Sequence, residues 1–130
     1  MGEHPNVERA RRGFGAFATG DRATIDELID ADAVWRIPGR NDLAGEYRGR
    51  DAILAMLRET AVRTGGTYRA EFHYGVADDE HVVAVYRAAG EREQRAIDIL
   101  QALIVRVEDR RWVEIDAVPT DQYAFDEFWS

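Results

Sequence analysis

Gln101 and Asp98 are the polar side chains with the clearest chemical potential, because they lie within the strongly apolar segment 96–107. A buried amide needs partners, so Gln101 would either bond a neighbouring backbone group or donate a hydrogen bond to a ligand carbonyl. Asp98 would either pair with an arginine, such as Arg87 or Arg92, or act as an acid–base group. In an extended chain the two residues point to opposite faces, so only one of them can line a given cavity. The sequence leaves open which one does.

His73 is the second candidate for acid–base catalysis, because an unperturbed imidazole titrates near neutral pH. It falls on the polar face of a predicted strand, so an exposed or subunit-contact position is the alternative. The three histidines, His4, His73 and His81, are scattered along the chain and show no metal-ligand spacing. We therefore expect no metal site.

Aromatic and apolar side chains from several segments could line a binding pocket. Trp35 and Ile37 share one face of a short predicted strand, and Phe14 lies on a predicted helix that should cover this face. Tyr47 and Tyr86 could supply phenol groups to the same cavity, or could pack with their hydroxyls in water. The expected pocket residues are Phe14, Trp35, Ile37, Tyr47, Tyr86 and Gln101.

The composition excludes several catalytic strategies and several kinds of partner. The chain has no cysteine and no lysine, and its only serine is Ser130, which argues against thiol, Schiff-base and serine-nucleophile chemistry. Its net charge of −8 predicts no nucleic-acid partner. No apolar run is long enough to cross a membrane, and the first residues lack the features of a signal peptide. We expect a cytoplasmic protein that uses no cofactor.

Hydrophobic periodicity predicts a helical first half and an extended second half. The predicted helices cover residues 7–19, 22–29 and 50–63, and the predicted strands cover 34–37, 46–48, 67–76, 81–88, 96–107 and 112–118. The sequence indicates a turn at 90–93 and an aromatic-rich terminal segment at 121–129. We expect residues 67–118 to form a curved antiparallel meander wrapped around helix 50–63, in a single domain that spans residues 1–130.

Two strands of this meander carry informative patterns. Tyr68, Ala70, Phe72, Tyr74 and Val76 alternate with polar or small residues, and this period of two predicts that they share the buried face of their strand. In the segment 96–107, the side chains on the strand face opposite to that of Gln101 form an apolar stripe. The three helices are expected to cover the Gln101 face and cannot cover this stripe as well. The stripe consists of Leu100, Ala102 and Ile104. It predicts a homodimer through the outer face of the sheet.

Several short motifs follow one another along nearly the whole chain. They are Thr19-Gly20-Asp21, the segment from Asp32 to Gly39, the segment from Leu43 to Ile53, Thr64-Gly65-Gly66-Thr67, and the closing segment from Asp121 to Trp129. In this order they resemble the SnoaL-like, ketosteroid-isomerase-related branch of the nuclear transport factor 2-like superfamily. The resemblance implies an α+β fold: a cone-shaped roll, or cystatin-like α+β barrel, with three N-terminal helices packed on a curved, mainly antiparallel sheet.

The resemblance also allows a test for the catalytic groups of ketosteroid isomerase, an aspartate base and a tyrosine–aspartate oxyanion pair. It places Ile37 at the position of the base, and Gly13, next to Phe14, at the position of the tyrosine. The partner aspartate corresponds to Gln101 or Leu103. None of the three groups is present, which excludes steroid isomerisation by that mechanism.

Two functions remain open on the sequence. The first is a SnoaL-like protein that binds a hydrophobic, polyketide- or steroid-like molecule in a largely apolar pocket, with cofactor-free isomerase, cyclase or lyase chemistry. The second is a non-catalytic ligand-binding or dimeric accessory domain. This scaffold hosts both kinds of protein, so the fold alone does not choose between them. A titratable residue inside the pocket would favour the enzyme.

Overall fold

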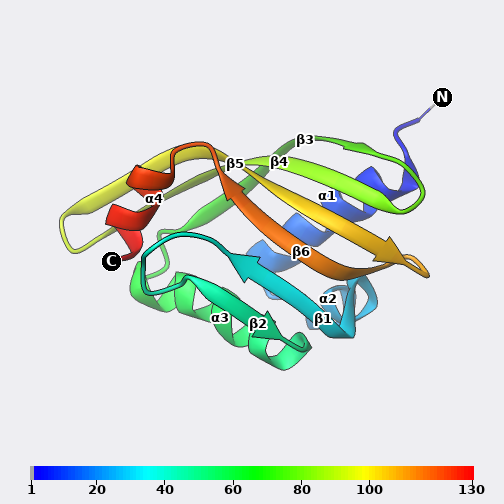
Figure 1. The fold of residues 1–130 in the computed structure, drawn as a ribbon, viewed down its shortest axis with the longest axis horizontal. Helices are drawn as coiled ribbons and strands as arrows, with labels where there is room; N and C mark the ends of the chain where they lie inside the picture. The colour runs from blue at the N-terminus through cyan, green and yellow to red at the C-terminus, as the bar shows by residue number, and fades with distance from the viewer. Residues whose placement is uncertain (1) are drawn as a thin grey trace.

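Six strands form one curved mixed sheet in the computed structural model, which describes residues 2–130 (Figure 1). They are β1 (Ile29–Ile37), β2 (Gly45–Arg48), β3 (Arg69–Ala77), β4 (His81–Arg92), β5 (Arg95–Glu108) and β6 (Arg111–Pro119). Their order across the sheet is β2-β1-β6-β5-β4-β3. The β1–β6 pair is parallel and the other neighbouring pairs are antiparallel. The predicted antiparallel meander, which corresponds to β3–β6, is confirmed.

Four helices accompany the sheet: α1 (Pro5–Thr19), α2 (Arg22–Leu28), α3 (Arg50–Arg63) and α4 (Gln122–Trp129). Local sequence explains their ends. Gly20, at φ +72, takes the left-handed conformation that ends α1, and Asp21 accepts a hydrogen bond from the backbone N–H of Thr24 to cap α2. Asp121 caps α4 in the same way through the N–H of Ala124. The aromatic-rich terminal segment is therefore a fourth helix.

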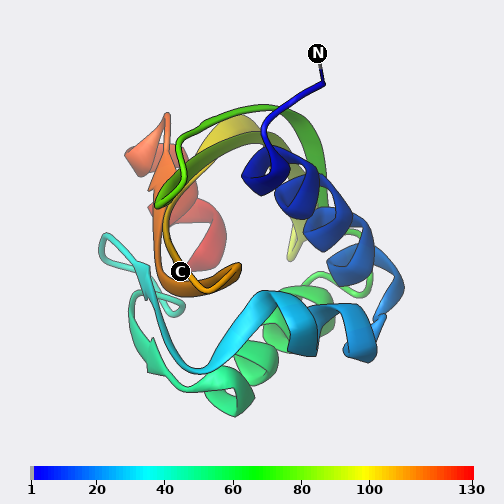
Figure 2. The same ribbon diagram turned by 90° about the vertical axis from the view of Figure 1, so that its right-hand side faces the viewer.

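The sheet curls so that, with the helices, it closes a ring when viewed along the long axis of the molecule (Figure 2). α1 packs against β3 and β4, α3 packs against β1 and β2, and α4 packs against β5. The predicted α+β cone-shaped roll is confirmed. The prediction that the meander wraps around helix 50–63 is wrong in detail, because α1 is the helix that packs directly on the meander.

Close approach of α1 and α2 explains one of the glycines of α1. A Cβ atom on Gly13 would collide with Cδ2 of Leu28. The missing side chain lets α2 lie against α1, which positions Phe14, the next residue, over the inner face of the sheet. Glycine costs a helix roughly 1 kcal/mol relative to alanine, and this contact offsets that cost.

The strand β3 departs from the predicted alternation at a β-bulge between Phe72 and Tyr74. The extra residue moves Tyr74 and Val76 to the outer face, where they are 58% and 62% exposed. Gly75 takes the inward position instead, where a Cβ atom would lie 3.3 Å from a methyl group of Val7 on α1. The prediction that Tyr74 and Val76 share the buried face with Phe72 is therefore wrong.

Candidate functional site

A cavity of about 540 Å³ lies between the inner face of the sheet and the helices α1, α3 and α4. Most of its wall is apolar, with Ile37, Leu43, Met56, Leu57 and Leu103 among the aliphatic side chains. Its aromatic lining residues are Phe14, Phe17, Trp35, Tyr68, Tyr86, Phe125 and Trp129. A partly enclosed apolar cavity with few polar groups is the usual form of a small-molecule site.

The structure brings together residues from four separate segments that the sequence places around a pocket. Phe14 comes from α1, Trp35 and Ile37 from β1, Tyr86 from β4 and Gln101 from β5, and all five line the cavity. The side chain of Gln101 therefore lies on the inner face of β5. Tyr47 does not line the cavity, contrary to expectation, because its hydroxyl turns away to donate a 2.7 Å hydrogen bond to the carbonyl of Leu43.

Gln101 and Tyr86 form the one side chain–side chain hydrogen bond between cavity-lining residues in the described part of the chain. The Nε2 of Gln101 donates to the Tyr86 hydroxyl at 2.7 Å, and these residues are only 3% and 5% exposed. The Oε1 of Gln101 is buried and finds no partner within residues 2–130. Burial raises the pKa of the Tyr86 phenol strongly, and the hydrogen bond from Gln101 opposes this rise only in part. Tyr86 is therefore a neutral hydrogen-bond donor at physiological pH.

Two further aromatic lining residues, Tyr68 and Trp129, carry polar groups and were not among the predicted pocket residues. Tyr68 contacts Trp129 edge to face, with ring centroids 5.4 Å apart. Burial raises the pKa of the Tyr68 phenol well above its usual range, with a smaller contribution from Tyr86. The indole Nε1 of Trp129 is buried without a partner among the described residues. The aromatic run at 121–129 was the available signal for Trp129, but its place over the cavity depends on how α4 docks.

Neither candidate for acid–base catalysis lines the cavity. The Asp98 carboxylate accepts two hydrogen bonds from Arg87, at 2.7 and 2.6 Å, which confirms the expected arginine pairing. The hydrogen bond from Arg87 lowers the pKa of Asp98, so this carboxylate stays ionised at neutral pH. His73 lies on the outer face with its Nε2 3.8 Å from Glu71. Among residues 2–130 no group of histidine, aspartate and glutamate side chains could hold a metal ion, and no helix is long and apolar enough to span a membrane.

Asp126 ties the loop after β1 to α4 at the end of the cavity. Its Oδ1 accepts hydrogen bonds from the Asn41 side chain at 2.7 Å, the Gln122 side chain at 3.0 Å and the backbone N–H of Arg40 at 3.1 Å. Gly39, at φ +99, has no room for a Cβ beside this carboxylate. The glycine of the Pro38-Gly39 step thus makes room for this contact, which fixes two elements that line the cavity through Leu43 and Phe125.

We expect the stabilising effect of Asp126 to depend on pH. The hydrogen bonds from Asn41 first, and then from Gln122 and Arg40, lower the pKa of its carboxyl group in the folded state. The stabilisation is therefore complete above the unfolded pKa of about 3.9 and is lost as pH falls through the lower folded value. The difference in melting temperature between the wild type and Asp126→Asn should be largest near pH 7 and shrink toward pH 3. A difference that stays constant with pH would show that the charge of Asp126 is irrelevant.

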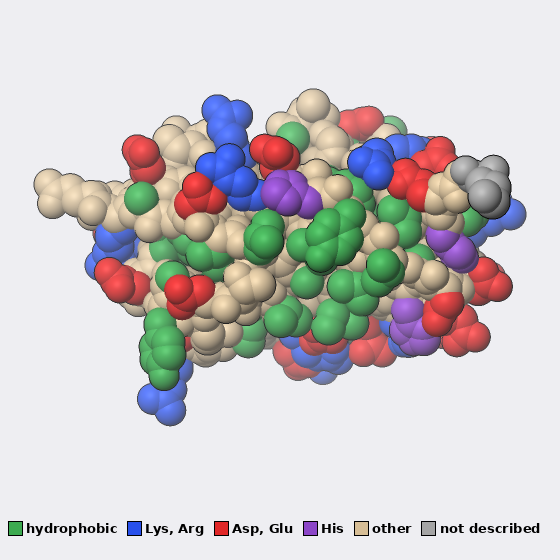
Figure 3. Space-filling model, turned by 90° about the horizontal axis from the view of Figure 1, so that it is seen from above, with side chains coloured by type: hydrophobic (Ala, Val, Ile, Leu, Met, Phe, Trp, Pro, Cys, Tyr) green, Lys and Arg blue, Asp and Glu red, His purple; other side chains and the backbone are tan. Residues whose placement is uncertain are grey.

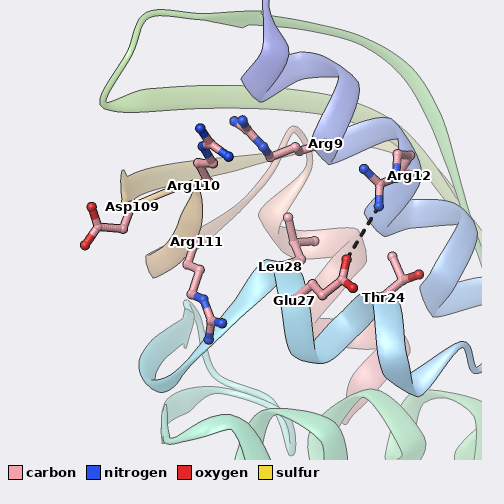
Figure 4. Close-up of a pocket in the computed structure, with 8 residues that line it drawn as sticks. All are labelled: Arg9, Arg12, Thr24, Glu27, Leu28, Asp109, Arg110 and Arg111. Atoms are coloured by element: carbon pink, nitrogen blue, oxygen red, sulfur yellow. Dashed lines mark ion pairs between the residues drawn. The ribbon is translucent and has the colours of Figure 1, made fainter.

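A second hollow, at the other end of the molecule, is charged and shares no lining residue with the cavity (Figure 4). Arg9 and Arg12 of α1 face Glu27 of α2 and the β5–β6 turn, which carries Arg110. Arg12 and Glu27 form a 3.8 Å ion pair. Exposed pairs of this kind contribute little to stability, and we regard this hollow as a solvated surface.

Comparison with known proteins agrees with the fold. The family model described as "SnoaL-like domain" matches residues 10–115. The uncharacterized protein Rv0034 of Mycobacterium tuberculosis is 31% identical over the full length of both chains. The solved structure of Bal32a, from a soil-derived mobile gene cassette, is 35% identical, covers 96% of each chain and superposes with a TM-score of 0.92. IdmH of Streptomyces antibioticus, which has been proposed to be a polyketide cyclase, superposes with a TM-score of 0.74 at 23% identity over 90% of this chain and 93% of its own.

Proposed function

This chain belongs to the SnoaL-like domain family, and from that premise we propose that it binds a hydrophobic small molecule in the cavity between its sheet and its helices. The observation that carries the proposal is the cavity itself, which is large, mainly apolar and lined by seven aromatic side chains, Phe14, Phe17, Trp35, Tyr68, Tyr86, Phe125 and Trp129. A ligand there would be held mainly by burial of apolar surface, worth about 25 cal/mol for each Å². The Gln101–Tyr86 pair would orient it.

We further propose that any reaction in this cavity is a cofactor-free isomerase, cyclase or lyase step on a polyketide- or steroid-like molecule. The fold shared with IdmH supports the polyketide alternative. The titratable groups that face the interior are the phenols of Tyr68 and Tyr86, both with raised pKa values. They can donate a hydrogen bond to a developing enolate but cannot take a proton at neutral pH. A substrate would thus have to be acidic itself or lose its proton to water.

The second candidate is a non-catalytic ligand-binding protein. It is favoured by the position of Asp98 and His73 outside the cavity, which leaves the interior without a carboxylate or imidazole among its buried lining residues. The lining includes Glu71, but its side chain is 67% exposed at the edge of the sheet. Both candidates require the same ligand-filled cavity and differ only in turnover.

Binding can be tested with naphthalene as the probe. Trp35 and Trp129 line the cavity, whereas Trp112 is fully buried elsewhere in the core. We expect saturable quenching of tryptophan fluorescence in the wild type. The variant Trp35→Phe should retain binding, as measured by equilibrium dialysis, but lose part of the quenching. The absence of saturable binding by dialysis would contradict the proposed function.

We also propose that the protein is a homodimer through the outer face of the sheet. Large apolar side chains are exposed there and gather across the middle of one face (Figure 3). They are Tyr74 and Val76 of β3, Leu100 and Ile104 of β5 and Val118 of β6. An exposed apolar patch of this kind is typical of a protein interface, and the bulge in β3 enlarges it beyond the stripe that the sequence predicts.

Sedimentation of a charged variant tests this interface. The wild type should sediment at about twice the chain mass of 14.8 kDa at micromolar concentration. Ile104→Arg should weaken the dimer by about 2 kcal/mol or more, because it places an unpaired charge in the centre of the buried patch. Val62→Arg is the matched control, since Val62 is also an exposed apolar residue but lies on α3. A monomeric wild type would rule out this interface.

A further inference from the structure

The Gln101–Tyr86 pair retains two unused donor hydrogens, the Tyr86 hydroxyl hydrogen and the second N–H of Gln101, and one unused acceptor atom. Because the Tyr86 oxygen accepts from Nε2 of Gln101, the hydroxyl hydrogen of Tyr86 remains free to donate, and no acceptor for it is found among residues 2–130. The Oε1 of Gln101 is a buried acceptor with no partner in the same part of the chain. Both residues line the cavity. From this arrangement we infer that the cavity selects hydrophobic molecules that carry a hydroxyl group. This inference rests on the proposed ligand-binding function and specifies its ligand class.

The pair has two requirements, a ligand acceptor for its free donors and a ligand donor for its free acceptor, and neither depends on the orientation of the amide. If the amide turns by 180°, the Tyr86 hydroxyl donates to Oε1 of Gln101, and both hydrogens of Nε2 become free to donate. The Tyr86 oxygen then supplies the free acceptor. In either orientation the pair has the same two requirements.

A hydroxyl group can meet both requirements at once, because it donates one hydrogen bond and accepts another. A ketone or ether oxygen can only accept a hydrogen bond. When such a ligand displaces water from the cavity, the free acceptor of the Gln101–Tyr86 pair is therefore left without a donor. A pure hydrocarbon leaves both groups unpaired. A site built around hydrogen bonds to a hydroxyl discriminates strongly against analogues that lack it, because the site's own polar groups are then left unpaired.

The surroundings of the pair favour a neutral hydroxyl over a carboxylate. Asp98 and Arg87 pair with each other on the outer face, so neither supplies charge to the interior. Arg69 is an exposed residue of the edge strand β3 at the cavity margin. An ionised ligand group beside Gln101 would therefore lose its hydration without gaining a counter-ion, which is costly.

The test compares 2-naphthol, 2-methoxynaphthalene and naphthalene, which share one ring system and differ at one position. Dissociation constants are measured by equilibrium dialysis for the wild type and for the double variant Tyr86→Phe/Gln101→Leu. We expect the wild type to bind 2-naphthol about tenfold more tightly than 2-methoxynaphthalene, the equivalent of about 1.4 kcal/mol. The double variant should lose this preference. Its affinity for naphthalene should be retained, because removing both partners together leaves no unpaired group.

The outcomes separate the inference from the function on which it rests. Equal binding of 2-naphthol and 2-methoxynaphthalene to the wild type, or an unchanged preference in the double variant, would overturn the hydroxyl selection while the cavity still binds naphthalene. Failure of the wild type to bind any of the three compounds would overturn the proposed function and the selection with it.

Discussion

Replacing Trp129 with alanine should lower the free energy of unfolding by about 3–5 kcal/mol, the usual cost of removing a large aromatic side chain from a core. Trp129 is 1% exposed and contacts Phe128 and Tyr68 edge to face, with ring centroids 4.8 and 5.4 Å away. Domains are stable by about 5–15 kcal/mol in total, so this single change would remove a large part of the stability. Urea denaturation followed by circular dichroism measures the loss.

The matched control lies on the same helix. Tyr123→Ala removes an aromatic ring that is 91% exposed, and its effect should stay within about 0.5 kcal/mol. Equal effects of the two substitutions would mean that α4 does not pack over the end of the cavity. A large effect of Trp129→Ala together with weaker naphthalene binding would link the helix to the cavity that it covers.

Filling the cavity should weaken binding strongly without unfolding the protein. Ala70 of β3 is half-buried and lines the cavity from an edge strand, where a larger side chain can enter existing space. We expect Ala70→Trp to weaken naphthalene binding by about a hundredfold, equivalent to about 2.8 kcal/mol, because the indole takes the place of the ligand. Equilibrium dialysis of the variant measures the effect, and its melting curve shows whether the fold is kept.

Ala89→Trp is the matched control. Ala89 lies on the neighbouring strand β4, next to the residue that pairs with Ala70, and its side chain points to the outer face of the sheet. It should leave naphthalene affinity unchanged within a factor of about two, because Ala89 is half-buried on the face of the sheet away from the cavity and does not line it. If Ala70→Trp bound naphthalene as well as Ala89→Trp does, the probe would have to bind outside the cavity.

The inner position of Gln101 could be predicted because β5 is long and regular. Every second residue from Ile97 to Val107 is apolar apart from Gln101, so parity alone puts its side chain with the core. Its partner could not be predicted, because Tyr86 faces Gln101 only through the register of the β4–β5 hairpin. The sequence indicated a turn at 90–93, whereas the turn is at Glu93 and Gln94, both with positive φ.

That error has a physical reason. Two-residue hairpin turns with positive φ usually contain asparagine or glycine, and this turn has neither, so the sequence gives no clear signal for its position. Strands that continue to Arg92 and Arg95 set the pairing of Tyr86 with Gln101. A shift of one residue would turn one of the two side chains to the outer face.

The bulge in β3 was not predicted, although the strand carries one signal for it. The alternation of Phe72, Tyr74 and Val76 is regular, and the one sign of a departure from it is Gly75, because an isolated glycine within a strand often marks a bulge or a close backbone approach. The bulge brings Gly75 against Val7 of α1, a contact between segments that are distant in the sequence. Tertiary packing therefore overrides the local period and moves two apolar residues to the proposed interface.

The most direct test of the central claim, that a hydrophobic molecule binds inside the cone, is a map of amide and indole chemical shifts of the isotope-labelled protein during titration with 2-naphthol. The account predicts saturable shifts at the indole N–H of Trp35 and Trp129 and at the backbone amides of Phe14, Tyr86 and Gln101, which surround the cavity. Shifts confined to the outer face, at Tyr74, Leu100 and Ile104, or no saturable shifts at all, would contradict it.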